Sequence, residues 1–142
     1  MLMKSKSSAG FSLVELLVVI AIIGILSSAG IITYNGYVEG TKKNSAENII
    51  QQISLAQSEE YANTGSYSVT GTGPTSSCSA STASSEEIES ELFAGEDIIP
   101  NDIDFEICIF GSASSFTIRG EHQKSSCVIS LARNGATTRT DC

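Results

Sequence analysis

The sequence predicts an α+β protein in which a long N-terminal helix packs on an antiparallel sheet of three or four strands. Three observations support this fold class. Residues 11–38 are mostly apolar, residues 39–64 follow an amphipathic helical pattern, and the C-terminal part alternates apolar and polar residues. We therefore divide the chain into a short N-terminal segment (1–10), the two halves of the helix, and a polar head (65–142).

Size and charge narrow the range of functions. The chain has 142 residues and a formal net charge of -8, so it has room for one domain with a modest core. A strongly acidic surface repels phosphate backbones, which makes nucleic acid a poor default partner. Four cysteines lie beyond the apolar run, and an even number in a small polar head indicates two disulfides and an oxidising compartment.

The first half of the helix has the length and composition of a membrane span. No residue from Leu16 to Val38 is charged, and a helix needs about 20 residues to cross the hydrocarbon core. Lys4 and Lys6 precede the run, which places the N-terminus in the cytoplasm and the head beyond the membrane. A cleaved secretory signal ending near Ala29 is the alternative, but the apolar pattern continues past that point through Ile32.

Glu15 is the unusual residue at the start of this run. A carboxylate at the edge of a membrane helix is costly unless it has a partner. One interpretation is a helix-start acid, favoured by the positive end of the helix dipole. The other requires a positive charge on a neighbouring molecule.

Gly10, Phe11 and Glu15 form a pattern that is followed directly by the apolar run. The pattern resembles the type IV prepilin motif, and the resemblance covers residues 4–37. It implies that residues 1–10 are a leader, and that prepilin peptidase cuts between Gly10 and Phe11 and N-methylates Phe11. It also implies that Glu15 pairs with the N-terminal amine of a neighbouring subunit, and that the head adopts the type IV pilin fold.

One position departs from the family pattern. Many members have proline where this chain has Ile32. Glycine is unfavourable inside a helix by up to about 1 kcal/mol relative to alanine. We therefore expect any local unwinding of the helix near Gly24–Gly30, although the same glycines also permit close helix packing.

The second half of the helix has one apolar stripe. Positions with spacings of three and four form this stripe, and it predicts the face that packs on the head: Ala46, Ile49, Ile50, Ile53 and Ala56. Asn63-Thr64-Gly65 is the predicted end of the helix.

The head begins with a segment rich in serine and threonine, residues 64–85, which predicts a solvated loop. Ser84 and Glu87 match a capping box, which predicts a short helix over residues 85–94.

Strands follow in the C-terminal part. Alternating patterns predict strands over residues 103–110, 116–119 and 128–131, and a last strand over 136–141. Asn134-Gly135 is a strong signal for a two-residue hairpin turn between the last two strands.

The predicted hairpin indicates how the cysteines pair. A two-residue turn places Arg133 opposite Ala136 and hence Cys127 directly opposite Cys142, within disulfide range. Such a bond closes a loop of about 15 residues and contributes ~3 kcal/mol in the chain-entropy model. Cys78 and Cys108 then form the second pair, which ties the serine-rich loop to the first strand.

No grouping of residues predicts an enzyme, a metal site or a cofactor. His122 stands alone in a predicted loop, where we expect it to be exposed. The acids at 86–106 include Asp97, Asp102 and Asp104, but they lack EF-hand spacing and favour a solvated acidic face over a calcium site.

The resemblance implies a structural subunit of a type IV pilus that serves adhesion, twitching motility or DNA uptake. Its implied partners are other copies of itself, prepilin peptidase, an inner-membrane assembly platform, a motor ATPase and an outer-membrane secretin. The subunit would wait in the bacterial inner membrane with its head in the periplasm, and then enter an extracellular pilus.

Two alternatives stay open. The first is a pseudopilin of type II secretion, although two disulfides favour a filament exposed to mechanical stress. The second is a minor pilin whose head binds DNA or a surface ligand. DNA binding would use a basic stripe of Arg119, Lys124, Arg133 and Arg139.

Overall fold

A computed structural model describes residues 10–71 and 76–142. Most of the predicted leader, with Lys4 and Lys6, and residues 72–75 of the serine-rich loop lie outside the described residues. The elements, in chain order, are α1 (Leu13–Thr64), α2 (Thr82–Leu92), the 3-10 helix η1 (Asn101–Ile103), β1 (Phe105–Ser112), β2 (Ser115–His122), β3 (Val128–Ala132) and β4 (Thr137–Thr140). The predicted α+β class, a long N-terminal helix with an antiparallel sheet, is therefore confirmed, with four strands.

Two compact units divide the chain, one ending at Glu39 and the other comprising Gly40–Cys142. In the first unit α1 is helical without interruption from Leu13, so the structure has no unwinding at Gly24 or Gly30. By length and composition, α1 contains a stretch that is long and apolar enough to cross a membrane.

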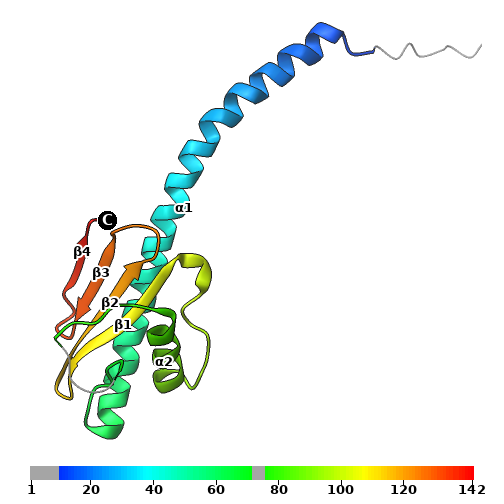
Figure 1. Cartoon of the computed structure of the whole chain (residues 1–142). Coiled ribbons are helices and arrows are strands. Elements are labelled where there is room, and N and C mark those ends of the chain that lie inside the picture. The colour runs from blue at the N-terminus through cyan, green and yellow to red at the C-terminus, as the bar shows by residue number, and fades with distance from the viewer. Residues whose placement is uncertain (1–9, 72–75) are drawn as a thin grey trace, which may run out of the picture. The chain divides into compact units, whose positions relative to one another are not determined.

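The head unit is organised around the second half of α1. Figure 1 shows the sheet lying across this part of the helix, with α2 beside β1. The buried face of α1 consists of Ala46, Ile49, Ile50, Ile53 and Gln57. Four of these were predicted, whereas Ala56 is only half-buried and Gln57 takes the next position of the stripe.

The sheet has the order β1-β2-β3-β4, and every neighbouring pair is antiparallel. Its inward residues form one core with α1 and α2. The largest of the fully buried apolar side chains are Ile50, Ile53, Ile88, Ile107, Ile109, Ile118 and Ile129. Gly120 of β2 lies under α1, where an added Cβ would stand 3.0 Å from the Ile50 side chain. The absence of a side chain at Gly120 therefore lets the helix approach the sheet closely.

Helix α2 starts earlier than predicted. Ser81 is its N-cap, and Ser84 rather than Glu87 completes the capping box. The Ser84 hydroxyl also donates to the Ile107 carbonyl at 2.7 Å, and the Ile107 N–H donates to the Ser85 hydroxyl at 3.0 Å. Both serines are buried because they satisfy the outer edge of β1, so the prediction of a solvated loop through residue 85 was wrong at these positions.

The hairpin between β3 and β4 differs from the prediction by one residue. Leu131 pairs with Thr137, and the N–H of Ala132 donates to the carbonyl of Ala136 at 3.0 Å. The turn thus has three residues, with Gly135 at φ +82°, where a positive φ favours glycine. The predicted two-residue turn was wrong because the dipeptide signal marks where the chain turns but leaves the loop length open.

Candidate functional site

The N-terminal signal residues lie at the start of α1. Gly10 and Phe11 precede the helix, and the Phe11 side chain is 79% exposed. Glu15 lies in the first turn, where its carboxylate accepts a bond of 3.5 Å from the Ser12 N–H. This position near the positive end of the helix dipole is favourable for a carboxylate. Within the described part of the chain, Glu15 forms no ion pair with a basic side chain.

The apolar side chains that follow are uncovered in the first unit. Among the large apolar residues from Phe11 to Tyr37, even the least exposed, Val19, is 44% exposed, and Ile32 is 77% exposed. A surface of this kind requires lipid or other protein chains to cover it in water. The first unit therefore combines an uncovered apolar helix with one carboxylate near its start.

Both disulfides lie in the head and join the pairs expected from the sequence. Cys78 is bonded to Cys108, with Cα atoms 6.2 Å apart, and Cys127 is bonded to Cys142 at 4.5 Å. The observed register of β3 and β4 does not by itself place Cys142 opposite Cys127. The strand ends at Thr140, and Asp141 has φ +54°, so a local bend beyond the strand accompanies the pairing.

Asp104 is the most strongly perturbed acid of the head. It follows η1 with φ +57°, and its carboxylate binds Lys42 of α1 and Lys124, the latter at 2.6 Å. Hydrogen bonds from Lys124 and then Lys42 lower the pKa of Asp104 from 3.8 to about 2. The Asp104 carboxylate, a possible calcium ligand from the sequence, is thus bound by two ammonium groups. In the described ranges, no group of three or more His, Cys, Asp or Glu side chains could hold a metal ion.

The predicted basic stripe is largely neutralised by acids. Arg119 pairs with Glu121 at 2.6 Å, and Arg139 pairs with Glu47 of α1. With Lys124 bound to Asp104, three of the four stripe residues are therefore matched by carboxylates. The stripe does not present the row of free charges that phosphate binding requires.

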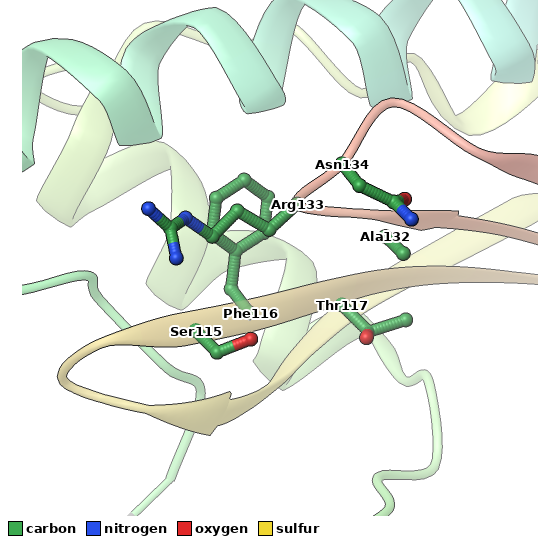
Figure 2. Close-up of a pocket in the computed structure, with 6 residues that line it drawn as sticks. All are labelled: Ser115, Phe116, Thr117, Ala132, Arg133 and Asn134. Carbon is green, nitrogen blue, oxygen red and sulfur yellow. The ribbon is translucent and has the colours of Figure 1, made fainter.

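Arg133 is the fourth residue of the predicted basic stripe, and its guanidinium is bound by neutral groups. Its Nε donates to the Tyr67 hydroxyl at 3.1 Å, and its Nη1 donates to the Ser114 carbonyl at 3.2 Å. Its guanidinium also lies 5.6 Å from the centre of the Tyr67 ring. Figure 2 shows the Arg133 side chain close to Phe116. Both residues line an open hollow of about 470 Å³, together with polar residues such as Ser115.

Two buried polar residues of the head differ from the sequence-based expectation. Gln57 is fully buried, and its side-chain amide bonds both the N–H and the carbonyl of Ser68, at 3.0 and 2.7 Å. His122 is only 7% exposed at the end of β2, where its ring meets Phe105 edge-on, so the prediction of an exposed loop residue was wrong. The sequence contains a signal for the burial of each residue. Gln57 follows the buried Ile53 by one helical turn, and His122 continues the alternation of buried residues along β2.

Comparison with known families identifies the N-terminal signal. Residues 5–31 match the family model described as the prokaryotic N-terminal methylation motif. This motif is the class III signal of type IV prepilins, and the observed arrangement of helix and sheet resembles the type IV pilin fold. The match supports the interpretation that this chain is a type IV pilin or pseudopilin, and it points to a structural protein rather than an enzyme. No curated protein and no solved structure matched the chain.

Proposed function

We propose that this chain is the precursor of a structural subunit of a type IV pilus filament. The observation that carries the proposal is the methylation motif at residues 5–31, together with an apolar helix that no described residue of its own unit covers. Such a helix suits anchoring in the inner membrane first and packing against the helices of other copies afterwards.

Processing supplies the charge that Glu15 lacks. Cleavage between Gly10 and Phe11 leaves an ammonium on Phe11, which the same peptidase N-methylates. In a filament core, Glu15 of one copy pairs with the Phe11 ammonium of the next, because opposite charges attract strongly where water is scarce. Apolar contact then holds the helices side by side, and this charge pair fixes their axial offset, since an unpaired charge would be costly.

The test of this assembly step is Glu15→Val in the full chain. We expect the variant to remain in the membrane and to give few filaments, because the Phe11 ammonium loses its partner. The matched control is Glu59→Val, which removes an exposed acid from the same helix and should leave filament yield unchanged. Mass spectrometry of sheared filaments should find N-methylated Phe11 as the first residue. A normal filament yield from Glu15→Val would refute the pairing.

The proposed filament serves adhesion, twitching motility or DNA uptake. Its assembly uses prepilin peptidase, an inner-membrane platform, a motor ATPase and a secretin, and the subunit leaves the membrane for an extracellular pilus. Two disulfides in the head favour this use over a type II secretion pseudopilus, because cross-links resist the stress met by an exposed fibre. Identification of the main protein in sheared surface filaments would separate the two.

A second candidate is a minor pilin whose head binds a surface ligand, and Arg133 is the observation that favours it. Its guanidinium is held in place by neutral oxygens, so its charge is available to a ligand carboxylate. DNA capture is less well supported, because three stripe residues are matched by acids. Arg133→Gln should reduce surface attachment with filament yield unchanged if this candidate is correct. Unchanged attachment would remove it.

A further inference from the structure

Arg133 is an exposed residue that the head holds at both its backbone and its side chain. Its main-chain N–H donates to the Phe116 carbonyl at 3.1 Å, and the Nε and Nη1 bonds to Tyr67 and Ser114 fix the guanidinium. A surface arginine ordinarily samples many rotamers, and it loses that freedom when a ligand binds. Here the freedom is already restricted in the free protein, so the side chain is preorganised for binding.

Tyr67, which holds the guanidinium, is itself fixed. Its ring stacks on Tyr61 with centres 4.5 Å apart and meets Phe116 edge-on at 4.7 Å, and its N–H donates to the Ala113 carbonyl at 3.1 Å. The Tyr67 oxygen accepts from the Nε of Arg133, so the hydroxyl hydrogen is left to donate. A charged fork and a hydroxyl donor thus lie side by side, an arrangement that suits the two oxygens of a carboxylate.

No carboxylate among the described residues is bound at this place. Within residues 10–71 and 76–142 Arg133 forms no ion pair, whereas Arg119, Lys124 and Arg139 each bind an acid. The positive charge of Arg133 is therefore left to attract an anion from another molecule. A single carboxylate suits this acidic head better than the row of charges on a nucleic acid, which a net charge of -8 repels.

The hollow beside Arg133 adds groups that bind hydroxyls. Its volume of about 470 Å³ lies within the range of small-molecule sites, and Arg133 lines it together with Ser115, Thr117 and Asn134. Figure 2 shows Ser115 and Thr117 on β2 and Asn134 in the turn after β3. The Asn134 Oδ1 accepts from the Ala136 N–H at 3.0 Å, which leaves the NH₂ group as a donor. Hydroxyl and amide side chains both donate and accept hydrogen bonds, as the hydroxyls of a sugar do.

We propose that this hollow, which we call the Arg133 site, binds an acidic sugar at the end of a surface glycan. The sugar carboxylate accepts from the Arg133 guanidinium and the Tyr67 hydroxyl, and the ring hydroxyls bond Ser115, Thr117 and Asn134. Because the hollow is open, the rest of the glycan stays in solvent. An acidic peptide would supply the carboxylate without the row of hydroxyls. The inference rests on the proposed ligand-binding head and names the class of its ligand.

Titration of the isotope-labelled full chain in detergent tests the site, with the Arg133 Nε–H and the backbone signals followed by NMR. The probes are the methyl glycosides of glucuronic acid and of sialic acid. Their controls are the methyl esters of the same sugars, which keep the hydroxyls and lose the charge. We expect at least one acid to bind about tenfold or more tightly than its ester, because the ester cannot form the charge-assisted bond. Equal affinity of acid and ester, or no shift from either acid at about 10 mM, would overturn the proposal.

Three simpler probes separate an acidic sugar from other anions. Acetate, inorganic phosphate and a blocked aspartate peptide should each bind more weakly than the sugar acid, since none of them carries the ring hydroxyls that the hollow receives. If acetate or phosphate binds as tightly as the sugar acid, the site recognises only charge and the proposal is wrong. If the peptide binds as tightly, the ligand class is an acidic peptide and the proposal is again wrong.

Two variants test the residues of the site. Arg133→Gln should weaken binding of the sugar acid by about tenfold or more, and Thr117→Val, which replaces a hydroxyl by a methyl group, by about twofold to tenfold. The matched controls are Arg119→Gln, whose arginine pairs with Glu121, and Thr138→Val at an exposed threonine of β4. Both controls should keep the wild-type affinity, and the backbone NMR signals show that each variant is folded. Wild-type affinity in Arg133→Gln, or in Thr117→Val if Arg133→Gln does not fold, would refute the proposal.

Failure of this inference differs from failure of the proposed function. If the chain forms filaments that require Glu15 but neither sugar acid binds, only the Arg133 site is wrong. If filaments never form and Phe11 is not found as a methylated terminus, the pilus function is wrong whatever the titration shows. If Arg133→Gln reduces surface attachment but neither acid binds, the head binds a ligand of another class.

Discussion

Gln57→Ala should be among the most destabilising substitutions on the head side of α1. The wild-type amide is fully buried and bonds both the N–H and the carbonyl of Ser68, so it fastens the loop after α1 to the helix. Alanine removes both bonds and leaves two backbone groups without a partner. A buried polar group left in this state costs about 1–3 kcal/mol.

The expected loss is therefore about 2–4 kcal/mol, since Ser68 is only half-buried and water can replace part of the bonding. That is a large fraction of the roughly 5–15 kcal/mol by which a domain is stable. Because the head has its own core, we expect its unfolding midpoint to fall while the first unit keeps its helical signal.

Urea unfolding of the full chain in detergent, followed by near-ultraviolet circular dichroism, measures this loss. The signal comes from packed tyrosines, and Tyr61 and Tyr67 stack with ring centres 4.5 Å apart beside the Gln57 contact. Gln52→Ala is the matched control, because Gln52 is exposed on the same helix and its loss should change stability by less than about 0.5 kcal/mol. If Gln57→Ala costs no more than Gln52→Ala, the two bonds to Ser68 do not hold the head together.

Three further predictions concern the head. Replacing Cys127 and Cys142 together with serine should lower the free energy of unfolding by ~3 kcal/mol, and peptide mapping without reductant should find the two residues linked in the wild type. The pKa of Asp104 is lowered to about 2, so its ion pairs contribute stability above about pH 4 that is lost as the pH falls towards 2. Asp104→Asn should flatten this part of the pH–stability profile, and an unchanged profile would contradict the assignment. Gly111→Ala should prevent normal folding, because φ at this residue is +145° and an added Cβ would lie 2.2 Å from the Ser115 carbonyl oxygen. Resistance to protease measures this effect, and a variant as resistant as the wild type would contradict the prediction.

Most of the fold could be predicted from local patterns in the sequence. The apolar run, the stripe that includes Ile50 and Ile53, and the alternation of the strands each depend on the repeat of a single element. A helix or strand imposes its period on the residues that it buries, so these patterns can be read without knowing the partner. The same reasoning could have placed Gln57 and His122 inside, but polar side chains are usually exposed unless a specific partner satisfies them. Ser68 bonds Gln57 from the loop after α1, whereas the His122 ring accepts from the N–H of Lys124 and packs against Phe105 of β1.

The sequence by itself determined the methylation motif at residues 5–31, the apolar helix and the strand content, because these depend on neighbouring residues. The tertiary structure alone decided the three-residue turn at Gly135, the burial of Ser84 and Ser85 at the β1 edge, and the capture of Asp104 by two lysines. Each of these depends on which distant backbone or side chain lies within hydrogen-bonding distance.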